Sequence, residues 1–196
     1  CMLLLASGIG LFSCAEKDLP KEYTDSVNVF IGTGGHGHTF PGATLPHGMV
    51  QLSPDTRLNG WDACSGYYYD DTSIMGFSHT HLSGTGIGDY GDILFMPVVG
   101  EKPLIAGTAE NPDEGYRSRV SHEQESARPG YYQVLLQDDS IHVELTATMR
   151  AGLHRYTYPK ASEARLIVDM EPTIHGHQRP VTQIRVVNDS TIAGMK

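Results

Sequence analysis

The chain has 196 residues, with 14 Lys and Arg against 23 Asp and Glu, and a formal net charge of −9 at pH 7. This acidic balance argues against a nucleic-acid partner, because phosphate binding needs clustered basic side chains. The 22 glycines and 11 prolines argue against a coiled coil or a helical bundle. The three cysteines give no disulfide framework, and the length suits one ordinary domain with its own core.

The first 14 residues are typical of a bacterial lipoprotein signal segment. Met2–Ser13 form an apolar stretch of about the length of a secretion signal. The stretch ends in Leu11–Cys14, which resembles a lipoprotein cleavage box. We therefore expect lipidation of Cys14, membrane attachment through that anchor, and export to the periplasm or outer-membrane surface. A polar linker over residues 15–22 follows. A buried N-terminal strand is the alternative interpretation of the apolar stretch.

Residues 23–196 predict an all-β domain. In its first half, two glycine-rich regions, 32–48 and 59–91, predict loops on either side of a short apolar strand at Met49–Leu52. Ile93–Val99 predicts a buried strand, and Pro97 within it indicates a sheet edge or a bulge. The loops therefore hold most of the unusual residue combinations of this half.

The second half shows clear strand patterns. Tyr132–Leu136 and Ile141–Leu145 alternate apolar and polar residues with Asp138–Ser140 as the turn, which predicts a hairpin with one face in the core. Ser121–Ala127 is briefly helical in pattern. Further strands are expected at Leu153–Tyr158, Leu166–Met170 and Gln183–Val187. Such repeated short strands favour an antiparallel β-sandwich.

Three histidine pairs share a His-x-His spacing and raise the question of a metal site. On a strand, two side chains at this spacing point to the same face and could chelate zinc. The sequence does not reveal a third ligand. Hydrogen-bonded loop histidines are therefore favoured over a zinc hydrolase, and no metal ligand is assigned. The pairs are His36/His38, His79/His81 and His175/His177.

Trp61, the only tryptophan, is the candidate carbohydrate-binding residue. It is followed by Asp62 and by the polar aromatic run Tyr67–Asp71. The apolar face of a pyranose packs on an indole ring while neighbouring polar groups bind its hydroxyls. A core tryptophan is the alternative. Cys64 has no evident general base beside it in the sequence, so we assign no catalytic residue.

Long ordered blocks carry a family resemblance. They begin with Asn28–Ala43 and continue through Pro46–Asp55, Ser65–Tyr67, Gly76–Gly86, Gly91–Ile93, Pro129–Tyr132, Glu144–Thr148 and His154–Tyr156. Together they resemble the opening of glycoside hydrolase family 92, the bacterial exo-acting α-mannosidases. The likeness covers essentially all of Tyr23–Lys196.

The resemblance implies an N-terminal β-sandwich followed by a catalytic (α/α)6 domain that is absent from these residues. It also implies calcium at the domain junction, bound mostly by the C-terminal domain. Inverting hydrolysis uses a carboxylic acid and a carboxylate base, which in the family lie in the C-terminal domain. No catalytic residue is therefore carried over. Trp61 is expected to contact the leaving-group sugar. His79 and His81 are expected near the cleft or the domain seam, with loop scaffolding as the alternative.

The C-terminal residues 184–196 predict a hairpin that turns into a strand without completing it. We therefore expect a truncated sandwich. The sequence predicts the carbohydrate-contacting N-terminal domain of a calcium-dependent, inverting exo-α-mannosidase acting on mannose-containing glycans, with its own C-terminal catalytic domain as a partner. The alternative is a stand-alone, lipid-anchored carbohydrate-binding β-sandwich without catalytic activity.

Overall fold

The computed structural model describes residues 22–84, 86–160, 163–176 and 181–196. The expected signal segment, Cys14 and the linker up to residue 21 lie outside the described residues. The strands are β1 (Ala43–Thr44), β2 (Gln51–Asp55), β3 (Ser73–Ile74), β4 (Gly76–Ser78), β5 (Leu94–Val99), β6 (Ser118–Arg119), β7 (Glu125–Arg128), β8 (Tyr131–Leu136), β9 (Ile141–Ala147), β10 (Gly152–Thr157), β11 (Ala164–Asp169), β12 (Gln183–Asn188) and β13 (Thr191–Met195).

Helical structure among the described residues is limited to short 3-10 turns. These are η1 (Tyr23–Ser26), η2 (Trp61–Ala63), η3 (Pro112–Glu114), η4 (His122–Gln124) and η5 (Ile174–Gly176). Within the described part of the chain, no helix has the length and apolar character needed to cross a membrane. The all-β prediction is confirmed.

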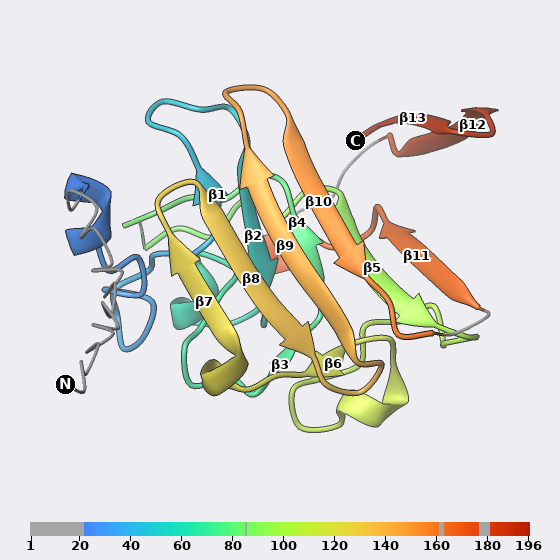
Figure 1. Cartoon of the computed structure of the whole chain (residues 1–196), viewed down its shortest axis with the longest axis horizontal. Helices are drawn as coiled ribbons and strands as arrows, with labels where there is room; N and C mark the ends of the chain where they lie inside the picture. Colours follow the sequence, from blue (N-terminus) through green and yellow to red (C-terminus); the bar gives the residue numbers. More distant parts are fainter. Residues whose placement is uncertain (1–21, 85, 161–162, 177–180) are drawn as a thin grey trace, which may run out of the picture.

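Two antiparallel sheets face each other (Figure 1). One has five strands in the order β1-β2-β4-β5-β11, and the other has four in the order β10-β9-β8-β7. The four-stranded sheet, yellow to orange, lies in front of β1, β2 and β4 in Figure 1. One continuous core draws buried side chains from both sheets, so the predicted antiparallel β-sandwich is confirmed.

The hairpin of β8 and β9 shows how the sequence pattern builds this core. Tyr132, Val134 and Leu136 are fully buried on β8, and their neighbours along the strand are only partly buried. Val134 pairs with Val143 of β9, which continues the same alternation. Because successive side chains of a strand point to opposite faces, one face of the hairpin enters the core. Each such buried side chain contributes about 1.5–3 kcal/mol through removal of apolar surface from water.

The structure refines two local predictions. Pro97 was expected at an edge or bulge; β5 as a whole lies between β4 and β11, in continuous register with β11, but within the described residues it has a partner on only one side at Pro97. The proline is tolerated because β4 pairs with β5 only at Phe95, which leaves β11 as the neighbour of Pro97 among the described strands. Ser121–Ala127 is helical only over η4, because the chain then pairs as β7 with β8.

The C-terminal hairpin of β12 and β13 stands apart from both sheets in Figure 1, where it is drawn in red. Its two strands pair with each other, with an irregularity between Val186 and Asn188. Large apolar side chains on it are exposed, including Ile184, Val186 and Ile192. The expectation that the sandwich continues beyond residue 196 stays a prediction.

Candidate functional site

Two loops meet beside the five-stranded sheet and form the candidate site. The loop at residues 32–38 closes on itself, since the Thr39 N–H donates to the Gly32 carbonyl at 3.2 Å. Gly37 is packed so tightly that a Cβ there would lie 2.1 Å from the Gly32 oxygen. The second loop contains η2, whose first residue is Trp61. In that loop the Ala63 N–H donates to the Gly60 carbonyl at 3.0 Å and the Gly66 N–H to the Ala63 carbonyl at 2.9 Å, so both loops are fixed by backbone contacts.

Trp61 presents its indole to solvent. Its side chain is 59% exposed, which excludes the alternative of a core tryptophan. The indole and the His38 ring make a T-shaped contact, with centroids 5.0 Å apart and an interplanar angle of 77°. The absence of a side chain at Gly86 makes room for the indole, since a Cβ there would lie 2.3 Å from Cη2 of Trp61. The exposed aromatic surface suits contact with the apolar face of a sugar.

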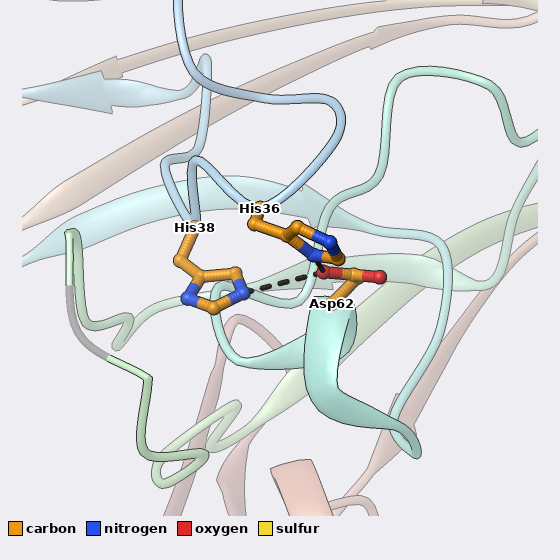
Figure 2. Close-up of side chains that lie close together, drawn as sticks. All are labelled: His36, His38 and Asp62. Carbon is orange, nitrogen blue, oxygen red and sulfur yellow. Dashed lines mark hydrogen bonds and ion pairs between the residues drawn. The ribbon is translucent and has the colours of Figure 1, made fainter.

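Asp62 lies between His36 and His38 (Figure 2). Its Oδ1 is 2.6 Å from Nδ1 of His36 and 3.4 Å from Nε2 of His38. The hydrogen bond from His36, with a weaker one from His38, holds the pKa of Asp62 below its usual range. His38 is buried and His36 is exposed. The structure thus supplies a third polar group to a histidine pair for which the sequence offered none.

His79 belongs to a hydrogen-bonded series of side chains between the two sheets, in which the histidines are neutral. Its Nδ1–H donates to the Ile93 carbonyl at 2.8 Å, which leaves Nε2 as an acceptor for His154 Nε2–H at 3.0 Å. The Tyr156 hydroxyl then donates to Nδ1 of His154 at 2.7 Å. Burial lowers the pKa of His79, and lowers that of His154 to about 3. The substrate contact expected for His79 stays a prediction.

His81 is 3% exposed and both of its ring nitrogens are occupied. Nδ1 donates to the Gln51 carbonyl at 2.7 Å, and Nε2 pairs with the buried Asp55 carboxylate at 2.9 Å. These contacts favour the scaffolding alternative for His81 within this chain, and its contact with substrate stays a prediction. The ring of Trp61 therefore contacts His38, whereas His81 pairs with Asp55.

A large cavity among the described residues lies elsewhere. It has a volume of about 670 Å³ and is lined by residues that include Leu58, Met75 and Glu171. The described lining does not include Trp61, His79 or His81. We place the candidate site at the Trp61 loop, because that is where an exposed aromatic ring and several polar side chains converge.

The profile of the Glycosyl hydrolase family 92 N-terminal domain matches residues 26–196. The chain belongs to glycosyl hydrolase family 92. The resemblance seen in the sequence is thereby confirmed, and family 92 accounts for almost the whole of the described chain.

Solved family 92 structures share the fold. The GH92 α-mannosidase BT3965 from Bacteroides thetaiotaomicron, in complex with mannoimidazole, is 48% identical with a TM-score of 0.81. The match covers 87% of this chain and 22% of BT3965. The inverting mannosidase BT2199 from the same organism is 32% identical with a TM-score of 0.60, over 76% of this chain and 20% of that one.

A curated relative gives the same picture. A protein from Arthroderma benhamiae called "Uncharacterized secreted glycosidase" is 32% identical over 142 residues, which are 68% of this chain and 17% of that protein. The chain therefore spans about a fifth of the length of the family 92 proteins it matches. This proportion fits an N-terminal domain of a larger family 92 protein.

Proposed function

We propose that this chain is the carbohydrate-contacting N-terminal domain of an exported, inverting exo-α-mannosidase that acts on mannose-containing glycans. The observation that carries the proposal is the exposed indole of Trp61, held beside Asp62 and His36 on a chain 48% identical to an α-mannosidase. Trp61 is proposed to stack on the leaving-group sugar, while the polar side chains beside it bind sugar hydroxyls.

The hydrolysis itself is proposed to use groups outside this chain. Inversion requires an acid that protonates the leaving oxygen and a base that activates water on the other face of the sugar. BT2199 is an inverting mannosidase, which supports the same stereochemistry here. This domain is proposed to hold the substrate in the correct position for those groups. The activation barrier of hydrolysis is then lower, because the entropy cost of orienting the substrate is met on binding.

Calcium is proposed to bind the parent enzyme mostly through residues beyond this chain. Calcium prefers six to eight oxygen ligands. Among the described His, Cys, Asp and Glu side chains, the one cluster of three close enough to share an ion is His36, His38 and Asp62. Two imidazole nitrogens in three donors do not suit calcium. No step of the reaction is therefore assigned to calcium through these residues.

Export is supported by the secreted glycosidase relative from Arthroderma benhamiae. Lipidation of Cys14, with attachment to the outer membrane, is the more specific proposal and rests on the sequence of the apolar N-terminal stretch.

The proposal is tested by replacing Trp61 in the full-length natural protein and measuring its hydrolysis of an α-mannoside. Loss of one aromatic stacking contact of about 1–2 kcal/mol is expected to lower kcat/KM about 5–30-fold in Trp61→Ala. Trp61→Phe is expected to retain most of the activity. Tyr23→Ala is the matched control, because Tyr23 is an aromatic residue that is 96% exposed.

Two results would count against the proposal. An unchanged kcat/KM in Trp61→Ala would remove Trp61 from the substrate contact. Binding of mannosides by the natural protein without any hydrolysis would instead support the stand-alone carbohydrate-binding module.

A further inference from the structure

The cluster of His36, His38 and Asp62 lies beside the proposed sugar contact and is also a set of metal-ligand donors. Its three ligand atoms all lie within 4.8 Å of one another. They come from two different loops, since His36 and His38 precede Asp62 by 26 and 24 residues. Figure 2 shows both imidazole rings directed at the same carboxylate oxygen. The donors thus converge from separate segments.

The distances from Asp62 to the two histidines can be compared with those of a tetrahedral metal centre. Zinc bonds of about 2.0–2.1 Å place neighbouring tetrahedral donors about 3.3 Å apart. The separation of His38 Nε2 and Asp62 Oδ1 is already 3.4 Å. The His36 pair, at 2.6 Å, must open by about 0.7 Å to reach that spacing. The His36 side chain is 78% exposed, so it can make this adjustment without disturbing the core.

The rest of the arrangement is fixed before any ion arrives. His38 is buried, and its backbone adopts a left-handed conformation with φ of 53°. Its carbonyl accepts from the Gly84 N–H at 2.6 Å, and its ring lies against Trp61. The tight packing of Gly37 on Gly32 holds the two histidines at the turn of one loop. His38 is therefore held in place, and His36 is the exposed ligand that can adjust its position.

We propose that His36, His38 and Asp62 form a binding site for a divalent transition metal ion of the zinc class. Two imidazole nitrogens and one carboxylate oxygen match the donors that zinc, copper(II) and nickel(II) prefer, and they discriminate against calcium and magnesium. Three protein ligands leave a fourth tetrahedral position for water or a ligand hydroxyl, next to the exposed indole of Trp61. The site does not depend on the proposed mannosidase activity.

Zinc titration of the natural protein by isothermal calorimetry tests this site, after treatment with a chelator and in the presence of excess calcium. We expect a zinc site that both Asp62→Asn and His36→Ala weaken at least tenfold. Asp62→Asn retains the shape and removes the charged donor. His47→Asn is the matched control, because His47 is an exposed loop histidine with φ of 60°, a conformation that asparagine tolerates.

Circular dichroism of each variant checks that it folds. If Asp62→Asn does not fold, His36→Ala decides the question, because it removes an exposed side chain. Equal zinc affinity in wild type and His36→Ala, or absence of zinc binding by the wild-type protein at millimolar zinc, would overturn the proposal. Loss of the site in His36→Ala with retention in His47→Asn would support it.

Discussion

The buried pair of Asp55 and His81 offers a quantitative test of how the candidate site is supported. Both side chains are almost completely inaccessible, at 1% and 0% exposure. One carboxylate oxygen of Asp55 is 2.9 Å from Nε2 of His81, and the other accepts from the Ser78 N–H at 3.1 Å. Asp55→Ala therefore leaves two buried donors without this acceptor.

The magnitude follows from these contacts. A buried donor left without its acceptor costs about 1–3 kcal/mol, and Asp55→Ala leaves two such donors. We expect Asp55→Ala to lower the free energy of unfolding of this domain by about 3–5 kcal/mol. For a domain of this size the loss corresponds to about 6–20 °C in Tm.

The loop that carries Trp61 depends on the same pair. Gly66 lies so close that a Cβ there would be 2.2 Å from Oδ1 of Asp55. The Thr56 N–H, directly after Asp55, donates to the Gly66 carbonyl at 2.7 Å. Asp55→Ala is therefore expected to loosen the loop between Trp61 and Gly66 as well as to destabilise the domain.

Differential scanning calorimetry of the natural protein measures the effect on the transition that contains this domain. Asp70→Ala is the control, because Asp70 is an exposed aspartate for which we expect less than about 0.5 kcal/mol. A loss of less than about 1 kcal/mol in Asp55→Ala would show that the pair does not anchor the fold, and would refute the reasoning from its burial.

Three further changes have definite expected outcomes. Gly86→Ala is expected to displace the indole of Trp61, because its Cη2 would lie 2.3 Å from the new Cβ. Mannoside binding in a titration should therefore weaken without a large change in Tm. Unchanged binding would contradict the assignment of the indole to the sugar contact. Because burial lowers the pKa of His79 and lowers that of His154 to about 3, the unfolded state binds more protons below about pH 6.5. Stability should therefore fall as the pH drops from about 6.5, by up to about 1.4 kcal/mol per pH unit for each histidine, and urea midpoints for His154→Gln should show a shallower slope. Globomycin is expected to block processing and lipid labelling at Cys14, and an unaffected product would contradict the lipoprotein assignment.

Much of the fold could be predicted from alternation along the chain. The pattern of Tyr132–Leu136 and Ile141–Leu145 indicated a hairpin with one buried face, and β8 and β9 form that hairpin. Pro97 indicated an edge, but the sequence could not show that β5 is an edge at that point only, because this depends on where β4 stops pairing with β5. Sequence patterns report local conformation, whereas the extent of a neighbouring strand is a property of the assembled sheet.

The candidate site was only partly accessible from the sequence. Trp61 was identified from its residue type and its polar neighbours, and the structure exposes its indole. Asp62 could not be linked to His36 and His38, because more than 20 residues separate them and only the folded loops bring them together. The adjacency of Asp62 to Trp61 was the one available signal. His79 and His81 share a spacing, but the fold gives their rings different partners.

We propose that this domain contacts mannoside through Trp61. The most direct measurement is a crystal structure of the natural protein soaked with mannoimidazole or with an uncleaved α-mannoside that extends into the leaving-group position. We expect a sugar ring in the leaving-group position within van der Waals contact of the Trp61 indole. A fully occupied mannoside, extending through that position with no atom near Trp61, would contradict it.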